Sequence, residues 1–380
     1  MVTDPPPAGG ASTQPHPYAR VAVIGGGAWG TALAAVARRA GREVRLWGRD
    51  AAVCAAIAGG GRNDKYLPGI ALPAGIAATD DLGRALDGAQ AVLLVTPSAT
   101  VREMCARLRP HLPARVPIAL CAKGIEVHTG LLLAQVVTEE LPGHPVGALS
   151  GPSFAHEAAK GFPTAVTVAF PFTYEDRLKP RAATAVRLAY TLSSPVFRPY
   201  ISDDLTGVEV GGAVKNVIAI ACGMMTGAGF AENTRAALIT RGINEMKTLA
   251  QALGGRRETV TGLSGAGDLT LTCSSQTSRN MSLGVQLGQG LARAECFDGR
   301  PVVVEGEVNA VSVIDLARRI GVRMPICEAV HAVLHDGAPL RETFARLWSS
   351  PLEAEPNMLD IYIDHPADLS AIPDFAGETR

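Results

Sequence analysis

The sequence has no excess of charge of either sign. Its 380 residues include 35 Lys and Arg against 36 Asp and Glu, which gives a formal net charge of −1. Domains that bind nucleic acids are usually strongly basic, so we expect no nucleic-acid partner held by bulk electrostatics. An acidic small molecule would have to be bound by a local cluster of cations instead.

Paired cysteines are also lacking. The seven cysteines are scattered, odd in number and never spaced as Cys-x-x-Cys. This pattern predicts neither a disulfide framework nor a zinc site, and it suits a reducing cytoplasm. His331 and His335 could share a metal with Glu328, but a capped helix end explains these histidines as well. We therefore expect a cytoplasmic protein without a metal site.

Long uncharged hydrophobic runs are missing as well. The proline-rich N-terminal segment lacks the apolar core of a secretion signal. The longest uncharged apolar stretch, residues 216–231, has 16 residues and is interrupted by Thr and Gly. That is shorter than the roughly 20 residues of a membrane-spanning helix. We expect no membrane span, a disordered tail over residues 1–18 and a loose tail over residues 365–380.

The rest of the chain divides into two regions. Between residues 19 and 202, short runs of Val, Leu and Ile alternate with helical patterns, and continuous runs indicate strands buried on both faces of a parallel sheet. Strands are expected at 20–25, 43–48, 91–97, 117–124, 145–151, 164–170 and 196–202. Between residues 203 and 364, long helices are expected at 206–225, 233–253, 281–291, 308–320 and 326–335. The predicted class is α/β, with a Rossmann-like doubly wound N-terminal domain and a mostly α-helical C-terminal domain.

A glycine-rich turn follows the first strand directly and opens a helix. Gly25, Gly27 and Gly30 match the pattern G-x-G-x-x-G, whose glycines permit a tight turn, close approach of a pyrophosphate and close helix–strand contact. The helix N-terminus offers free N–H groups and a partial positive charge to phosphates. A chain with 41 glycines matches this pattern easily by chance. The position at the first strand and first turn nevertheless predicts a dinucleotide cofactor.

The end of the second strand indicates the type of cofactor. An acid at this point usually binds the 2′-hydroxyl of NAD, whereas an arginine accommodates the 2′-phosphate of NADP. Here Arg49 is followed by Asp50, which lies slightly late for the role of the acid. Both residues could also simply begin the next helix. We expect use of NADP, with NAD also possible.

Two lysines lie in unusually apolar surroundings for a chain with only six lysines. Lys123 lies at the C-terminal end of a predicted buried strand, where ligands of open α/β sheets bind. Lys215 lies in a predicted helix that is apolar nearly all round, and burial would lower its pKa and make it a usable acid or base. The alternative is that its amine reaches water along the protein surface.

A further polar group of residues begins at Asp268 and Thr272 and continues to Ser278, Arg279 and Asn280. An arginine beside a hydroxyl and an amide suits a phosphate group, because a guanidinium binds two phosphate oxygens at once. Taken alone, the same segment is equally typical of a helix N-cap followed by a solvated arginine.

Seven segments are diagnostic when they are taken together. They are the turn at 25–30, AKG at 122–124, SGPSFA at 150–155, GGAVKNVIAIACG at 211–223, GLSGAGDLTLTC at 262–273, SRN at 278–280 and VVEG at 303–306. In this order, over residues 20–335, the chain resembles the NAD(P)-dependent glycerol-3-phosphate dehydrogenases of the bacterial type. The resemblance implies hydride transfer between carbon 2 of sn-glycerol 3-phosphate and a nicotinamide, with dihydroxyacetone phosphate as the other product. It also implies a homodimer, and a supply of glycerol 3-phosphate for glycerophospholipid synthesis.

The same resemblance implies roles for individual residues. Lys215 would exchange the proton, Lys123 would hold the C2 oxygen, and Asp268 would complete the catalytic set. Further substrate contacts would be Gly151, Ser153, Asn216, Thr272, Ser278, Arg279 and Asn280. Cofactor contacts would be Gly25, Gly27, Ala28, Trp29, Gly30, Arg49, Lys123, Ala155, Arg279, Val303 and Glu305.

Two other functions stay open from the sequence. Another hydroxyacid or ketoacid reductase, such as a ketopantoate-type enzyme, would keep the glycine pattern and a lysine in the helical domain. It would have no reason to carry the AKG, GDL and SRN segments together. A non-catalytic dinucleotide-binding protein would be expected to lose Lys123 or Lys215, and both are present.

Overall fold

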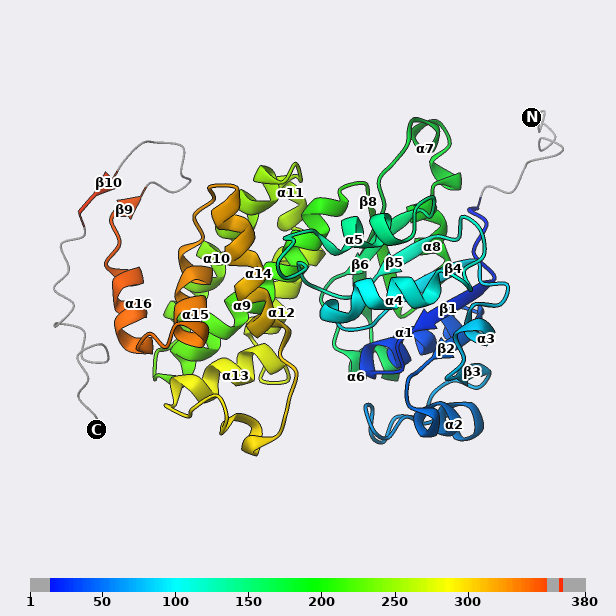
Figure 1. Cartoon of the computed structure of the whole chain (residues 1–380), viewed down its shortest axis with the longest axis horizontal. Coiled ribbons are helices and arrows are strands. Elements are labelled where there is room, and N and C mark those ends of the chain that lie inside the picture. Colours follow the sequence, from blue (N-terminus) through cyan, green and yellow to red (C-terminus); the bar gives the residue numbers. More distant parts are fainter. Residues whose placement is uncertain (1–13, 354–361, 365–380) are drawn as a thin grey trace, which may run out of the picture.

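The computed structural model describes residues 14–353 and 362–364, in which a sheet-containing region is followed by a helical region (Figure 1). The first region contains an eight-stranded sheet of order β3-β2-β1-β4-β5-β6-β7-β8. Its neighbouring strands are parallel except for the antiparallel pair of β6 and β7. The predicted doubly wound α/β domain is thereby confirmed.

The strands are short and mostly buried. Their bounds are β1 (Arg20–Ile24), β2 (Glu43–Trp47), β3 (Ile76–Thr79), β4 (Ala91–Leu94), β5 (Ile118–Leu120), β6 (Val146–Ser150), β7 (Thr164–Ala169) and β8 (Phe197–Ser202). Every residue of β4, β5 and β6 is buried, as expected for strands covered on both faces. β3 was not predicted, because Ile76 is its only buried residue and the strand carries no apolar run.

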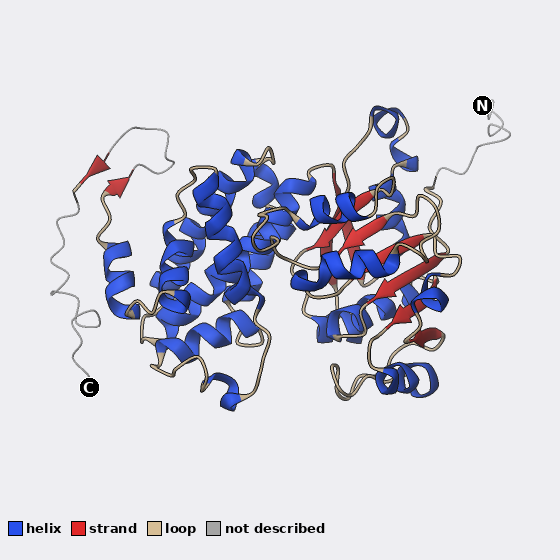
Figure 2. Cartoon of the chain, in the orientation of Figure 1, coloured by secondary structure: helices blue, strands red, loops and turns tan. Residues whose placement is uncertain are grey.

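Helices cover both faces of this sheet (Figure 2). They are α1 (Ala28–Arg39), α2 (Ala51–Gly60), α3 (Leu82–Leu86), α4 (Val101–Leu108), α5 (Leu133–Glu140), α6 (Ala155–Lys160), α7 (Tyr174–Leu178) and α8 (Thr184–Leu192). Alternate residues of β1 enter two different cores: Val21 and Val23 pack in one, Ala22 and Ile24 in the other. Successive side chains of a strand point to opposite faces, so each face of the sheet has its own core.

After β8 the described chain is helical almost throughout. The helices are α9 (Leu205–Gly227), α10 (Glu232–Ala252), α11 (Arg257–Val260), α12 (Asp268–Cys273), α13 (Arg279–Gly288), α14 (Glu305–Arg319), α15 (Pro325–His335) and α16 (Leu340–Trp348). A short antiparallel pair, β9 (Leu352–Glu353) and β10 (Tyr362–Ile363), follows. The predicted mostly helical second domain is confirmed, although α11, α12 and α16 were not foreseen.

α9 is the central helix of this second region. It is buried without interruption from Val210 to Met225. A Cβ on Gly223 would collide with the carbonyl of Met281, and one on Gly284 with the carbonyl of Ile220. The backbones of α9 and α13 therefore touch, which holds the start of α13 close to the middle of α9.

α9 also differs from the expectation about membranes. Its 23 residues are long and apolar enough to cross a membrane by length and composition, because the helix begins before the uncharged stretch and includes Glu209 and Lys215. Of its most apolar 18-residue window, 94% is buried inside the protein, as is also found for the core helix of a globular domain.

The expected N-terminal tail ends earlier than residue 18. Tyr18 is buried, its N–H donates to Thr191 Oγ1 at 2.8 Å, and the guanidinium of Arg187 lies over its ring. This packing corrects the expectation of disorder for residues 14–18, where proline-rich composition concealed an anchoring tyrosine. Residues 1–13 and the expected C-terminal tail at 365–380 lie outside the described residues.

Candidate active site

Three charged side chains from separate segments meet in the interior. Lys123 Nζ lies 2.5 Å from Asp268 Oδ2, and Lys215 Nζ lies 2.9 Å from Asp268 Oδ1. Lys215 Nζ also donates to Thr272 Oγ1 at 2.8 Å. Lys215 and Asp268 are only 6% and 2% exposed. The structure thus brings the two lysines singled out from the sequence onto one buried carboxylate.

Glycines make this meeting sterically possible. A Cβ on Gly211 would lie 2.8 Å from the carbonyl oxygen of Ser264, and one on Gly212 would lie 3.3 Å from Lys123 Cγ. The segment before Asp268 forms a π-helical turn, Leu263–Gly267, that packs against Gly211 of α9, whereas Gly212 faces the side chain of Lys123. The GGAVK and GLSGAGD motifs are therefore two halves of one close contact, which places Asp268 opposite Lys215.

The surroundings shift the pKa values of the two lysines in opposite directions. Burial lowers the pKa of Lys215, and the neighbouring Lys123 lowers it further against the opposing effect of Asp268. For Lys123 burial acts the same way, but the carboxylates of Asp268 and Glu305 outweigh it and raise its pKa. Burial would raise the pKa of Asp268, yet the two lysines lower it. A lysine that gives up its proton more readily thus lies beside one that keeps its charge.

A line of amides connects α9 to α13 and α14. Asn216 Nδ2 donates to Glu305 Oε2 at 3.2 Å, and Asn280 Nδ2 donates to Asn216 Oδ1 at 2.9 Å. The backbone N–H of Gly306 in turn donates to Asn280 Oδ1 at 2.9 Å. Asn216, Asn280 and Glu305, predicted as ligand contacts, are therefore held in one network beside Lys215.

At the start of α13, a serine that caps the helix is followed by an arginine whose guanidinium is unpaired within the described residues. Ser278 Oγ accepts from the N–H of Met281 at 3.3 Å, so this serine is the N-cap that the sequence allowed as an alternative. Arg279 is exposed, and among the described residues its guanidinium has no hydrogen-bond or ion-pair partner. Its donors are therefore available to an anion at the helix N-terminus.

The glycine-rich turn has the geometry of a phosphate cradle. Gly25 has a φ of +133°, and its Cβ would lie 2.7 Å from the carbonyl oxygen of Val95; a Cβ on Gly30 would collide with the Gly25 carbonyl. Nothing lies within 4 Å of a Cβ on Gly27, and α1 begins there without a side-chain cap. Packing thus requires the first and third glycines, whereas the space over the second is open for a pyrophosphate.

Other predicted contacts lie around the same edge of the sheet. Gly151 and Ser153 follow β6, next to the strand that precedes Lys123, and Ser153 Oγ donates to the Gly151 carbonyl at 3.0 Å. Ala155 begins α6, and Val303 is 61% exposed just before α14. Ala28 and Trp29 form the first turn of α1, and Arg49 is exposed after β2. Their contacts with ligands stay predictions.

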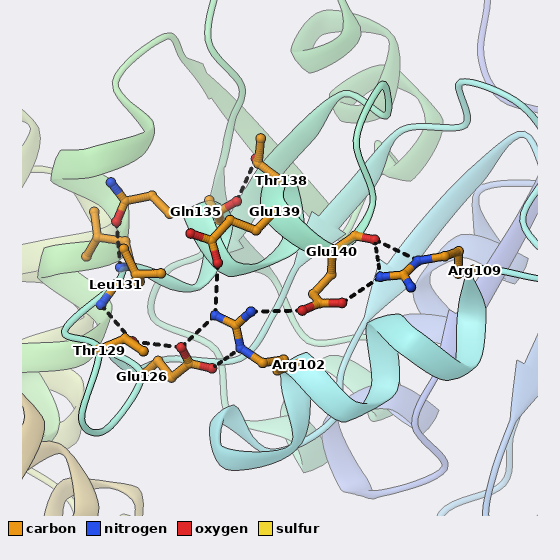
Figure 3. A network of polar contacts seen from close by, with 11 residues as sticks. Arg102, Arg109, Glu126, Thr129, Leu131, Gln135, Thr138, Glu139 and Glu140 are labelled. Carbon is orange, nitrogen blue, oxygen red and sulfur yellow. Dashed lines mark hydrogen bonds and ion pairs between the residues drawn. The ribbon is translucent and has the colours of Figure 1, made fainter.

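The loop that carries Lys123 is fixed by a network around one arginine (Figure 3). Arg102, on α4, donates to both oxygens of Glu126 at 2.8 Å each, and to Glu139 and Glu140 of α5 at 3.0 and 2.8 Å. Arg102 also keeps the pKa of Glu126 below its usual range. A bidentate pair of this kind fixes geometry as well as charge, so the backbone just beyond Lys123 is held firmly.

Asn309 joins the two segments that carry the lysines, and the sequence did not reveal it. This wholly buried residue of α14 donates through Nδ2 to the carbonyl of Lys123 at 3.2 Å and to the carbonyl of Ala213 at 3.1 Å. Lys123 belongs to the sheet-containing region, whereas Ala213 lies two residues before Lys215. An amide in an otherwise apolar helical stretch was the available signal, but the two carbonyls it binds could not be read from it.

A glycine cradle beyond the first strand and a buried lysine pair from the following helical region together define a two-domain, nucleotide-dependent dehydrogenase. The family model described as NAD-dependent glycerol-3-phosphate dehydrogenase N-terminus matches residues 20–174, and that of the C-terminus matches residues 204–345. The chain therefore belongs to the NAD(P)-dependent glycerol-3-phosphate dehydrogenase family, as the resemblance predicted.

Individual relatives agree with this assignment. Glycerol-3-phosphate dehydrogenase (NAD(P)+) of Rhodospirillum rubrum is 48% identical over 335 residues, covering 88% of this chain and 93% of the relative. The crystal structure of glycerol-3-phosphate dehydrogenase from Coxiella burnetii matches with a TM-score of 0.80 at 38% identity, over 87% of this chain and 99% of that one. A ketopantoate reductase from Ralstonia eutropha, at 18% identity and a TM-score of 0.52, shares the fold alone. The chain is thus an NAD(P)-dependent oxidoreductase that acts on glycerol 3-phosphate.

Proposed function

We propose that the protein interconverts sn-glycerol 3-phosphate and dihydroxyacetone phosphate with Lys215 as the group that moves the proton at the C2 oxygen. The observation that carries this proposal is the buried triangle of Lys215, Asp268 and Lys123. Burial lowers the pKa of Lys215, so its amine accepts the hydroxyl proton during oxidation and returns it during reduction. Thr272 accepts a hydrogen bond from the same amine and orients it.

Lys123 has a different part in this scheme. Its raised pKa keeps it cationic, so it stabilises the negative charge that develops on the C2 oxygen. Asp268 binds both lysines and keeps two buried cations close to one another. Without this carboxylate the two positive charges would repel across a short distance in a poorly solvated space.

The residues of the cradle suit a nicotinamide dinucleotide. The N–H groups at the start of α1 and the open space over Gly27 would hold the pyrophosphate, with Arg49 towards the adenosine ribose. Glu305, fixed by Asn216, would lie on the nicotinamide side together with Ala155 and Val303. When bound, the nicotinamide exchanges the hydride with carbon 2 of the substrate.

The phosphate of the substrate is assigned to the start of α13. Arg279 has free donors, and Ser278 and Asn280 hold the helix start in place. A guanidinium next to a helix N-terminus favours a doubly charged phosphate over a neutral hydroxymethyl group. Gly151 and Ser153, which follow β6, would line the same substrate.

We propose further that the protein is a cytoplasmic homodimer that supplies glycerol 3-phosphate for glycerophospholipid synthesis. The seven cysteines are free and buried, which suits a reducing compartment. On the edge strand β8, Tyr200 and Ile201 are exposed, and such an apolar sheet edge supports contact with a second copy. Light scattering of the purified protein at several concentrations tests the dimer directly.

The activity is tested by the oxidation of NADPH, followed by absorbance after addition of dihydroxyacetone phosphate. We expect turnover with this substrate, and little with dihydroxyacetone, ketopantoate or a simple 2-ketoacid, because only the first offers both the ketone and the phosphate. Turnover of ketopantoate in preference would favour a related reductase. Binding of NADPH without turnover of any ketone would favour a non-catalytic dinucleotide-binding protein.

A further inference from the structure

Both carboxylate oxygens of the acid that follows Arg49 accept hydrogen bonds from within the protein. Asp50 is the N-cap of α2, and its Oδ1 accepts from the N–H groups of Ala52 at 3.0 Å and Val53 at 3.3 Å. Its Oδ2 accepts from Lys65 Nζ at 2.6 Å. One oxygen is thus committed to the helix and the other to a lysine fifteen residues further along the chain.

Lys65 lies on a loop that bridges the end of β2 and the glycine-rich turn. Asn63, two residues earlier, donates through Nδ2 to the carbonyl of Gly26 at 3.1 Å. Leu67, two residues later, is buried, and its N–H donates to the Asn63 carbonyl at 2.7 Å. A Cβ on Gly26 would lie 3.1 Å from Gly48 Cα, so the turn and the end of β2 are themselves in contact. The loop therefore presents Lys65 at the border of the cradle.

Three charges thus gather where the adenosine ribose of a dinucleotide would lie. Arg49 and Lys65 are positive and Asp50 is negative, which leaves one net positive charge. Lys65 holds the pKa of Asp50 below its usual range, and Asp50 raises that of Lys65, so the pair is fully charged at neutral pH. A free carboxylate at this strand end would accept the 2′-hydroxyl of NAD and repel a 2′-phosphate. Here each oxygen of that carboxylate already accepts a hydrogen bond, and the charge is paired with that of Lys65.

We propose that Lys65 is a specificity-determining residue for NADP. By pairing with Asp50 it cancels the charge that would select NAD, and it leaves a net positive charge for the 2′-phosphate. This inference rests on the proposed cofactor site at the glycine-rich turn and deepens it. The expectation from the sequence considered Arg49 and Asp50 alone, and the structure adds Lys65 to them.

Binding of cofactor fragments tests the proposal without turnover. 2′,5′-ADP and 5′-AMP differ only in the 2′-phosphate, and calorimetry on the purified protein gives a Kd for each, alongside those of NADPH and NADH. We expect Lys65→Met to weaken 2′,5′-ADP and NADPH by about five- to tenfold at low salt, since one charge is lost at a partly exposed site. 5′-AMP and NADH should stay within about twofold, because they lack the affected group.

A second substitution separates pairing from direct contact. Asp50→Asn keeps a capping oxygen for α2 but removes the negative charge, so it should tighten NADPH relative to NADH. In the double variant Lys65→Met/Asp50→Asn the net charge returns to one positive, and the ratio of the two Kd values should return close to that of the native protein. The matched control is Lys179→Met, which removes a lysine that is also exposed and paired, with Glu175 at 3.5 Å. Lys179 follows α7, between β7 and β8 at the opposite edge of the sheet from β3 and α2 (Figure 1).

Three results would overturn the inference. The first is an equal loss of NADPH and NADH affinity in Lys65→Met, and the second is a cofactor ratio indistinguishable from that of Lys179→Met. The third is a double variant whose ratio of NADPH to NADH Kd values equals that of Lys65→Met. The charge of Asp50 would then have no effect on the choice of cofactor, and Lys65 would act without pairing to it. If the native protein binds neither dinucleotide, the proposed cofactor site fails and this inference fails with it, an outcome that differs from all three.

Discussion

In the proposed function, Arg279 would recognise the substrate phosphate almost alone among the three residues of the SRN segment. Ser278 is used as a helix cap, and the amide of Asn280 is used by Asn216 and Gly306. We expect Arg279→Ala to lower kcat/KM for dihydroxyacetone phosphate by about 10- to 150-fold, the equivalent of 1.5–3 kcal/mol for a hydrogen bond to a charged group. The preference over dihydroxyacetone should fall by the same factor.

Steady-state kinetics with both ketones measure this effect. Arg300→Ala is the control, since Arg300 is exposed and paired with Asp298, outside the described site. A strong phosphate preference that survives in Arg279→Ala would contradict the assignment.

At the residue scale, the sequence indicated which residues to consider for the site, but not which side chains they bond in the folded protein. The scarcity of lysine, the apolar residues around Lys215 and the position of Lys123 at a strand end singled out the two lysines, and the family motifs suggested a catalytic part for Asp268. The sequence did not predict that Asn280 bonds Asn216, 64 positions away, or that Lys65 neutralises Asp50. Such pairs depend on which elements lie side by side in the fold, and this arrangement cannot be derived from a single sequence.

At the element scale, α14 links the helical region to the loop that carries Lys123. Asn309 on this helix holds the backbones of Lys123 and Ala213, which differ in sequence by 90 positions and come from the two regions of the protein. We expect Asn309→Ala to lower kcat/KM about tenfold or more, because catalytic groups displaced by about 1 Å can lose two orders of magnitude. The Kd of NADPH should change less than about twofold, since the cradle lies elsewhere.

Kinetics and calorimetry on the same preparations test this prediction. Ser312→Ala is the matched control, since Ser312 is also buried on α14, one turn further on, and contacts the Asn309 carbonyl rather than a lysine segment. Similar losses in both variants, in step with their stability, would show that Asn309 acts only through packing.

Helix α15 depends on a cap from another helix. Its own N-cap, Met324, offers no side-chain acceptor, and Glu245 of α10 accepts instead from the N–H groups of Ile326 at 2.6 Å and Cys327 at 3.3 Å. Burial raises the pKa of Glu245 to about 7. A raised pKa means that the folded protein holds this proton more tightly than the unfolded chain. The contribution of Glu245 to the stability of the folded protein is therefore complete below the unfolded pKa near 4.5. It is lost as the pH rises through 7.

The raised pKa of Glu245 gives a prediction for the pH dependence of stability. Between pH 5 and 8 the free energy of unfolding of the native protein should fall by about 3 kcal/mol relative to Glu245→Gln, which cannot ionise. Denaturant titrations at several pH values measure the difference, with Glu342→Gln, on the exposed face of α16, as the control. Curves that run parallel for native protein and Glu245→Gln would contradict the prediction.

Each feature that the sequence did not predict was hidden for a physical reason of its own. β3 has a single buried residue, so it lacks the apolar run that marks the other strands. α12 directly follows the glycine-rich turn at 263–267, whose composition is typical of a connector. The antiparallel direction of β7 could not be foreseen either, because a buried strand has the same apolar pattern in both directions.

For the whole molecule, the site lies where the sheet-containing and helical regions meet. Glu209 of α9 accepts from the N–H of Ala134 at 2.8 Å, at the start of α5. Arg319 of α14 donates to the carbonyls of Thr129 at 2.7 Å and His128 at 2.9 Å. These bonds, with that of Asn309, surround the loop that carries Lys123. The contact between the two regions therefore builds the triangle of Lys123, Lys215 and Asp268, which neither region contains alone.

In the mechanism proposed above, the pH dependence of oxidation is opposite to that of reduction. Oxidation needs the neutral amine of Lys215, so its kcat/KM should rise as the pH increases through the pKa of Lys215, which burial places below the usual range of a lysine. Reduction needs the protonated amine and should fall over the same interval. Initial rates in both directions against pH, with glycerol 3-phosphate and with dihydroxyacetone phosphate, measure this behaviour. Two profiles that rise together would exclude a single shared proton carrier.

The most direct test of the central claim is the turnover number of Lys215→Ala for reduction of dihydroxyacetone phosphate, measured together with the Kd of NADPH. We expect kcat to fall by about 10²- to 10⁴-fold, roughly 3–5 kcal/mol, because the proton donor is removed, while NADPH binding stays within about twofold. Lys247→Ala, in α10 of the same region, should leave both quantities unchanged. A Lys215→Ala enzyme that turns over within about tenfold of the native rate would contradict the claim that this lysine moves the proton.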